Sequence, residues 1–264
     1  MTKAELIDRF AAGEDQRILL ARILDKAELA RSRSIPAHTP FLSAGEQAAA
    51  RQMLAAGGYS RFCFYGGFEG AERAVCVFLP DWQEEFVPGD EDDPLAAIET
   101  AFPSGSGLTH RDFLGSLMGL GLTRELLGDI LVGDGKCQIV LLRQSLPILL
   151  SQWCEVGRYP ARPRSIPLSG LEVIPPNVTL LRDTFQSLRF DAVAAAAFGL
   201  PRSKAASLIS GGRILLNHQV CEKPDRNLAE GDVLTGRGLG KCVLRSVTGQ
   251  SRKGRIMVEL EKYQ

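Results

Sequence analysis

The chain has 264 residues, of which 45% are hydrophobic and 23% charged, so it can bury more than one core and we expect two or three domains. Its apolar stretches fall far short of the about 20 residues that span a membrane, and its six cysteines include no Cys-x-x-Cys pair, which argues against a zinc site and a disulfide framework. We therefore expect a cytoplasmic monomer that enters no membrane and holds no metal or cofactor.

The first predicted domain, residues 1–80, combines helical spacing with strand-like runs. Its predicted elements are two helices over 6–29 separated at Gly13, a helix over 44–56 that stops at Gly57, and strands over 61–65 and 74–79. The aromatic residues of the first strand invite a base-stacking interpretation, but a hydrophobic strand pair is the favoured one. The acidic, proline-containing run over 81–93 is predicted to be a solvated loop.

The second predicted domain, residues 94–175, alternates strands and helices. Its predicted elements are a strand over 95–102, a helix over 109–119 capped by Thr109, a hairpin of 129–132 and 138–142, a helix over 146–156 and a strand over 164–168. This order predicts a ferredoxin-like fold, the topology of the RNA-recognition motif. Because residues 137–142, the central strand, lack the aromatics with which such motifs stack bases, RNA binding on the face of the sheet is not expected.

The third predicted domain, residues 181–264, follows a proline-rich connection and begins with a helical pair. Prolines stand in this connection at 160, 163, 167, 175 and 176. The first helix should stop at Gly199, before Pro201, and the second should run from Arg202 to Gly211-Gly212, ahead of a strand over 213–217.

Two cations and a hydroxyl, from Arg202, Ser203 and Lys204, open the second of these helices. Cations are unfavourable at a helix N-terminus on dipole grounds, so their presence indicates that an external anion binds there, with a phosphate as the obvious candidate.

The formal net charge is zero, with 31 basic and 31 acidic residues, but the two ends of the chain differ. Residues 181–264 contain 14 Lys and Arg against 8 Asp and Glu, a net charge of +6, which leaves −6 on residues 1–180. Such asymmetry is the electrostatic footprint of a polyanion partner at the basic end.

The order of helix pair, glycine pair, Asn-containing turn and closing Gly231-Asp232-Val233-Leu234 strand resembles the S4 RNA-binding domain, an αL-type module, over about residues 180–235. In that family, the matching residues lie on one face against folded RNA. The RNA-binding residues expected here are Arg189, Arg202, Ser203, Lys204, Ser207, Arg213, Asn217 and Lys223. One departure is His218, which stands where the family usually carries glycine.

A wider resemblance comes from the run LTHRDFLGSLMGLGLTRELLGDI, Leu108 to Ile130, and from the terminal GRGLGK and SRKGRIMVELEKY. These segments are similar to the YlmH family of bacterial RNA-binding proteins from about Leu95 onward. The resemblance implies an N-terminal helical segment, a middle domain like an RNA-recognition motif and a C-terminal S4 module. It also implies association with the ribosome, rescue of stalled large subunits carrying peptidyl-tRNA and, in some bacteria, a part in cell division.

An enzymatic function finds little support in the motifs. His110-Arg111-Asp112 is similar to the catalytic loop of protein kinases, but Leu117 stands where the loop needs Asn. The Gly238–Lys241 run lacks the spacing and the Ser or Thr of a phosphate-binding loop. We interpret His110, Arg111 and Arg124 instead as secondary RNA contacts.

These observations predict an α+β, non-catalytic protein that binds ribosomal RNA and tRNA on the large subunit through its C-terminal module, recognising RNA shape and phosphates rather than base sequence. Two alternatives stay open. One is an RNA-modifying enzyme of the pseudouridine synthase or methyltransferase type, because S4 modules accompany such enzymes. The other is an adaptor for division proteins that uses the acidic N-terminal half.

Overall fold

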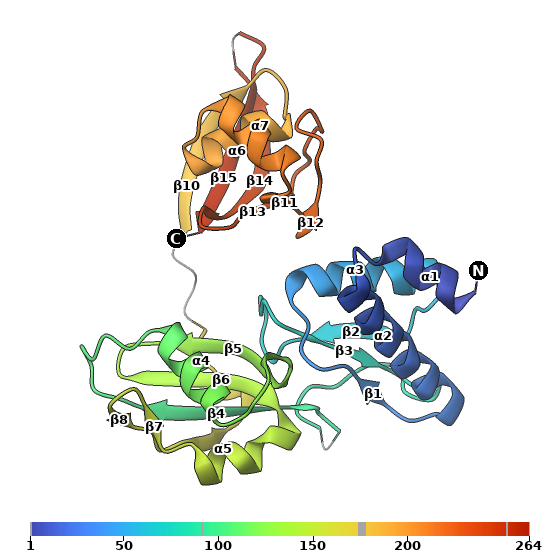
Figure 1. Cartoon of the computed structure of the whole chain (residues 1–264), viewed down its shortest axis with the longest axis vertical. Coiled ribbons are helices and arrows are strands. Elements are labelled where there is room, and N and C mark those ends of the chain that lie inside the picture. Colours follow the sequence, from blue (N-terminus) through green and yellow to red (C-terminus); the bar gives the residue numbers. More distant parts are fainter. Residues whose placement is uncertain (1, 91, 174–177, 252, 264) are drawn as a thin grey trace. The chain divides into compact units, whose positions relative to one another are not determined.

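The computed structural model describes residues 2–90, 92–173, 178–251 and 253–263 and divides into two compact units, Met1–Ile174 and Pro175–Gln264 (Figure 1). Both units mix helices and strands, which confirms the predicted α+β class. The boundary predicted between residues 1–80 and 94–175 falls inside the first unit. Pro175 and Pro176 of the predicted connection lie outside the described residues. Within the described ranges, no helix is long and apolar enough to cross a membrane.

Three helices open the first unit: α1 (Lys3–Phe10), α2 (Glu14–Arg33) and α3 (Ala44–Ala56). Capping boxes set two of the starts, because the side chains of Thr2 and Ser43 each accept a hydrogen bond from the backbone of a glutamate three residues on. The predicted break before α2 and the predicted end of α3 at Gly57 are both confirmed. The helices enclose one apolar core, in which Leu20, Met53 and Leu54 are fully buried.

A three-stranded antiparallel sheet in the order β1-β3-β2 accompanies these helices. Its strands are β1 (Ala37–His38), β2 (Phe62–Tyr65) and β3 (Val75–Phe78), which confirms the two predicted strands. Phe62 and Phe64 pack against the helical core, and their rings meet edge to face at 5.9 Å. The favoured interpretation of this aromatic run, a hydrophobic strand pair, is therefore confirmed.

The end of the acidic loop over 81–93 was predicted to be solvated, and this is wrong at Asp93, whose side chain is buried. Its carboxylate accepts hydrogen bonds from the Tyr65 hydroxyl at 3.2 Å and from the backbone N–H groups of Gly89 and Leu95, both at 2.8 Å. These donors replace the water that a buried carboxylate loses. Burial, followed by the nearby Asp93 carboxylate, raises the pKa of Tyr65.

The rest of the first unit is built on a four-stranded antiparallel sheet in the order β5-β6-β4-β9. Its elements are β4 (Leu95–Ala101), α4 (His110–Gly119), η1 (Arg124–Leu126), β5 (Leu127–Val132), β6 (Lys136–Leu142), η2 (Arg143–Ser145), α5 (Leu146–Gln152), β7 (Glu155–Val156), β8 (Tyr159–Pro160), β9 (Arg164–Ile166) and η3 (Leu168–Gly170). The predicted order of strands and helices is present, with an extra β7–β8 hairpin. The ferredoxin-like class of this domain stays a prediction.

Helix α5 is shorter than predicted, because it ends at Gln152 and the chain then forms the β7–β8 hairpin. The change of direction is fixed by Trp153, whose ring N–H donates to the Ser116 hydroxyl at 2.8 Å, while that hydroxyl donates to the Glu155 carbonyl at 2.5 Å. Gly157 takes the left-handed backbone conformation that the hairpin turn needs, with φ of 58°. The prediction missed these tertiary contacts, which override the apolar pattern of this stretch.

The second unit pairs two helices with a six-stranded sheet in the order β10-β15-β14-β13-β11-β12. Its elements are β10 (Val178–Phe185), α6 (Phe190–Phe198), α7 (Arg202–Ser210), β11 (Ile214–Leu216), β12 (Gln219–Val220), β13 (Val233–Gly236), β14 (Gly240–Gln250) and β15 (Ile256–Tyr263). Both predicted helices are confirmed, and α6 stops where Gly199 takes φ of 64°. Phe190, Ile209 and Leu260 are buried in the core between the helices and the sheet.

Candidate nucleic-acid interface

A buried carboxylate organises the predicted basic face of the second unit. The Asp191 side chain, in the first turn of α6, is only 7% exposed. It accepts hydrogen bonds from Nε and Nη2 of Arg189 at 3.2 and 3.0 Å, and from Nη2 of Arg202 at 3.1 and 3.3 Å. Burial alone would raise the pKa of Asp191, but the hydrogen bonds from the two arginines outweigh it and hold the pKa below its ordinary value. The ionised carboxylate thus fixes both guanidinium groups.

The Asp191 carboxylate supplies an internal anion for the first residue of α7. Arg202 at the first position of the helix is already paired with Asp191, so its presence there does not require an external phosphate. Its side chain is still 57% exposed, and Ser203 and Lys204 next to it are exposed as well. Ser207, one turn further on, is exposed too. Three polar groups with solvent-facing donors therefore accompany a guanidinium of fixed orientation.

Asn217 is engaged within the unit, in the turn that joins β11 and β12. Its side-chain N–H donates to the Asp232 carboxylate at 2.7 Å, and its side-chain oxygen accepts from the Val233 N–H at 2.8 Å. Asn217 and His218 both have positive φ, 50° and 64°, as in the two-residue hairpin turns that favour Asn-Gly. The amide thus holds the turn against the start of β13.

The remaining predicted residues, Arg213 and Lys223, are exposed on loops on either side of the β11–β12 hairpin. The loop that carries Lys223 is docked on the start of α6, because the Phe190 N–H donates to the Arg226 carbonyl at 2.8 Å. Arg226 is exposed and was not among the predicted residues. Asp191 was missed as well, although a lone carboxylate in the apolar run FDAVAAAAF was a usable signal.

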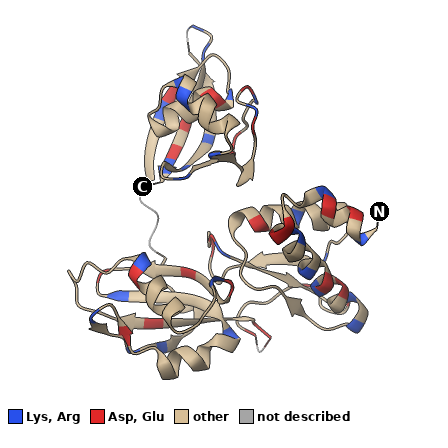
Figure 2. Cartoon of the chain, in the orientation of Figure 1, with Lys and Arg blue, Asp and Glu red and all other residues tan. Residues whose placement is uncertain are grey.

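The charge of the second unit is spread over several of its elements. Figure 2 shows Lys and Arg on its helical layer, on its loops and on the hairpin that joins β14 to β15. The unit carries 14 basic and 8 acidic residues, and Asp191, Asp232, Glu259 and Glu261 among the latter are hydrogen-bonded or paired inside the unit. A surface of this kind attracts a polyanion without selecting its sequence.

The residues predicted as secondary contacts lie around the start of α4 and in η1. His110 and Arg111 are exposed, and the Thr109 N–H and hydroxyl donate to the Asp112 carboxylate at 2.8 and 2.7 Å, which confirms the predicted cap. Arg124 is half-buried, and its carbonyl accepts from Arg73 Nη2 at 3.0 Å. Nη1 of the Arg124 guanidinium is buried, so part of this group is withdrawn from the surface.

The face of the four-stranded sheet opposite α4 and α5 is covered by other parts of the first unit. Phe41 and the β3 residues Val75 and Val77 pack on Val140 of the sheet. The contact is close, since a Cβ atom on Gly128 would lie 2.8 Å from the Phe41 ring. An apolar core thus occupies the part of this face that lies nearest the N-terminal strands.

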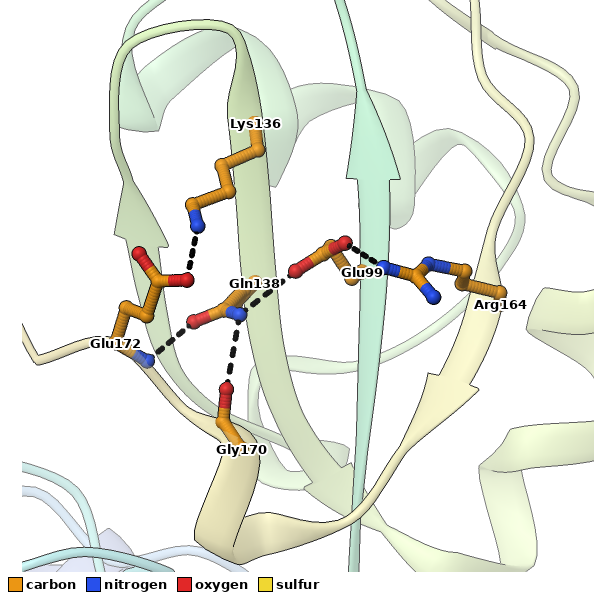
Figure 3. A network of polar contacts seen from close by, with 6 residues as sticks. All are labelled: Glu99, Lys136, Gln138, Arg164, Gly170 and Glu172. Atoms are coloured by element: carbon orange, nitrogen blue, oxygen red, sulfur yellow. Dashed lines mark hydrogen bonds and ion pairs between the residues drawn. The ribbon is translucent and has the colours of Figure 1, made fainter.

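A polar network covers a further part of this face (Figure 3). Gln138, a buried residue of β6, donates to the Glu99 carboxylate at 2.8 Å and to the Gly170 carbonyl at 3.3 Å, and accepts from the Glu172 N–H at 2.7 Å. Arg164 binds Glu99 at 2.6 Å, and this bond, then that from Gln138, lowers the pKa of Glu99. The segment after β9 is therefore fixed across the surface on which RNA-recognition motifs stack bases.

The described part of the chain holds neither a cluster of metal-ligating side chains nor a disulfide. No group of three or more His, Cys, Asp or Glu side chains there is placed to hold a metal ion. The six cysteines are unpaired thiols, and burial raises the pKa of Cys76 and Cys137.

Two family models match the chain. The model described as "Putative RNA-binding domain in YlmH" matches residues 88–169, and the S4 domain model matches residues 188–234. The protein named "Ribosome-associated protein quality control protein P2" from Bacillus subtilis (strain 168) is 28% identical over 250 residues, which cover 94% of this chain and 96% of that protein. The solved structure "Cell division protein ylmH from Streptococcus pneumoniae" covers 60% of this chain and 95% of its own, with a TM-score of 0.51 and 21% identity, a likeness of fold alone.

Proposed function

We propose that this chain, which belongs to the YlmH family of RNA-binding proteins and carries an S4 domain, docks on ribosomal RNA of the large subunit together with tRNA and acts there in ribosome-associated quality control. Its site of action is the cytoplasm, where ribosomes are found. The protein works by binding and position, not by catalysis. The observation that carries the proposal is the Asp191 carboxylate, which orients two arginines on the positive unit.

The mechanism follows from the groups on and around α7. Arg189 and Arg202 are held by Asp191, so each loses little side-chain freedom when a phosphate binds to its exposed edge. Lys204 and Ser207 extend the contact along the same helix, with a charge and a hydroxyl. Arg213, Lys223 and Arg226 add exposed cations from the loops around it. Folded RNA, with phosphates spaced in three dimensions, suits such a surface better than a single anion does.

The role of Asn217 is narrower in this proposal than in the sequence-based one. Because its amide is bonded to Asp232 and Val233, it shapes the turn that presents the neighbouring backbone, and it contributes at most its remaining N–H to RNA. His110 and Arg111 are proposed as contacts of the first unit, made from the exposed start of α4 rather than from the face of the sheet.

Co-sedimentation of the full chain with large ribosomal subunits carrying peptidyl-tRNA tests the proposal. The double variant Arg202→Ala/Lys204→Ala should bind more weakly, and its affinity for RNA should depend less on salt, by up to about two units of slope. Because Arg202 also pairs with Asp191, the single variant Lys204→Glu separates RNA contact from folding. Arg182→Ala is the control. Arg182 lies on β10 with its side chain 77% exposed, and this substitution removes one cation from the same unit at a distance from α7 in the sequence.

Unchanged co-sedimentation by a folded double variant would remove α7 from the interface. The enzymatic alternative has its own test. If nucleosides from a strain lacking this protein miss one specific modification that the wild-type gene restores, the protein is a modifying enzyme and the binding proposal is wrong.

A further inference from the structure

We infer that the hairpin formed by β14 and β15 is a second contact with the RNA phosphate backbone, outside the residues that the S4 domain model matches. The inference rests on the proposed function and extends it. The hairpin lies after residue 234, the last residue of that match, and the sequence-based prediction assigned it no ligand.

The first observation is exposure. In β14, Leu244 is the last buried residue, and every residue from Arg245 to Gln250 is exposed or half-buried. At about 3.3 Å per residue, this part of the strand extends roughly 20 Å past Leu244. This part of the hairpin therefore faces solvent and contributes no buried residue of β14 to the core.

The second observation is charge. The sequence from Arg245 to Met257 contains four basic residues and no acidic one. Arg245 is paired with Glu261 at 3.0 Å, and the Glu230 carboxylate accepts from the Val247 N–H. Among the described residues, none forms an ion pair with Lys253 or Arg255 near the tip. These two cations are thus available to an external anion.

The third observation is order at the tip. The Ser251 N–H donates to the Arg255 carbonyl at 2.8 Å, and the Ser251 hydroxyl accepts from the Arg255 N–H at 3.1 Å. Arg255 Nη2 donates to the Thr184 carbonyl at 2.5 Å, which ties the tip to the end of β10. A tip held in this way loses little conformational freedom on binding.

The position of the tip links it to the S4 helices. Phe185, the last residue of β10, pairs with Ile256, the first residue of β15, and Arg189 at the start of α6 follows four positions later. The hairpin tip and the Asp191-bound arginines are therefore at the same end of the sheet. An RNA seated on α7 can reach both, so the two elements can hold phosphates on separate strands or turns of one folded RNA.

RNA is favoured over other partners by the chemistry of the hairpin. Near its cations in the sequence stand Thr248, Gln250 and Ser251, whose hydroxyl and amide groups are of the kind that bind phosphate oxygens, and the Thr248 hydroxyl also donates to the Met257 carbonyl at 3.4 Å. Gly249 and Gly254 have positive φ, 134° and 71°, and no side chain to keep a sugar-phosphate backbone at a distance. The apolar residues Val247 and Met257 are only 37% and 39% exposed, too little for a hydrophobic docking surface.

The test uses the full chain and a labelled RNA stem-loop that the wild type binds. Lys253→Gln/Arg255→Gln should weaken binding roughly tenfold at 0.15 M salt and lower the salt slope by about one to two, since each lost phosphate contact lowers it by about one. The matched control is Lys241→Gln/Lys262→Gln, which removes two cations from the opposite end of the same two strands. The single variant Lys253→Gln leaves the Arg255–Thr184 hydrogen bond in place. A loss of RNA affinity in this variant is therefore not caused by a folding defect of the tip.

Equal affinities of the tip variant and its control would overturn the inference while the proposed function stands, provided that the α7 variants still lose RNA. If the tip variant keeps its affinity for the stem-loop but loses large subunits, the hairpin contacts a ribosomal protein and the inference is wrong. Absence of RNA binding by the wild type would overturn both. A loss confined to the tip variant supports the inference.

Discussion

In the first unit, both faces of the four-stranded sheet are covered from within the unit, by α4 and α5 on one side and by Phe41, β3 and the segment after β9 on the other. In the second unit, two helices cover one face of a six-stranded sheet, and the basic residues are spread over the helical layer, the loops and the strands. The units also carry opposite net charges, −6 and +6.

The comparison shows that polar side chains of the two units are buried with different consequences for the surface around them. Gln138 lies on the central strand β6. Its side chain donates to Glu99 and accepts from the Glu172 N–H, so it holds the segment after β9 on the sheet. In the second unit a buried carboxylate plays the opposite part, because Asp191 orients cations that stay exposed. Burial of Gln138 therefore holds a segment over the sheet of the first unit, whereas burial of Asp191 holds exposed arginines in place on the second unit.

The largest expected effect breaks the covered face of the first unit. Phe41→Ala should destabilise that unit by about 3–5 kcal/mol, because it removes a buried ring that contacts Gly128 and Val140. The two units should then melt separately in calorimetry, with the second transition unmoved. Phe41→Leu is the control and should cost clearly less. A single transition shifted as a whole would contradict the independence of the two units.

A smaller effect is expected in the second unit from Asp191→Asn, which should destabilise it by about 2 kcal/mol. This loss of stability is smaller than the loss expected on breaking a fully buried ion pair, because Arg189 and Arg202 are partly exposed and solvent screens their charges. Since the pKa of Asp191 is lowered in the folded state, its stabilisation is present above the unfolded pKa of about 3.9 and is lost as the pH falls through the folded value.

Chemical unfolding of the wild type and the variant across this acidic range measures the effect. The wild type should lose stability as the pH falls below about 4, and Asp191→Asn should show a flatter profile. Asp183→Asn, in the same unit but exposed, should match the wild type. Parallel profiles for the wild type and Asp191→Asn would mean that the carboxylate does not organise the arginines.

Gln138→Ala tests the polar closure of the sheet shown in Figure 3. It leaves the Glu172 N–H and the Gly170 carbonyl without their partner, so we expect a loss of about 1–2 kcal/mol in the first unit. RNA affinity at matched salt should not change. The exposed Gln144→Ala is the control. A gain or loss of RNA affinity in Gln138→Ala alone would show that this face takes part in binding.

The smallest expected effect is a gain. His218→Gly should stabilise the second unit by about 0.5 kcal/mol, since His218 has a φ of 64° and glycine adopts this conformation without strain, at some cost in unfolded-state entropy. Gln219→Gly on the adjoining strand is the control and should not stabilise. A lower melting temperature for His218→Gly would show that the contacts of the imidazole outweigh the strain of the turn.

The sequence by itself determined the elements whose signals are local. Glycines placed the ends of α3, α6 and α7 to within a residue, and Thr109 marked the start of α4, because a helix end is decided by the few residues that satisfy its terminal N–H and C=O groups. The charge difference between the two units is likewise a property of composition, and the S4 and YlmH matches follow from residue order.

Only the tertiary structure decided which polar groups are buried and what they hold. The neighbours of Asp93 and Gln138 in the sequence do not reveal that these side chains are buried, and the apolar run around Asp191 does not reveal its partner Arg202, since these partners come from positions 11 to 39 residues away. The same holds for the end of α5, set by Ser116 across the unit, and for the sheet face closed by the N-terminal strands. Periodicity reports which side of an element is apolar, whereas packing between distant segments decides what covers it.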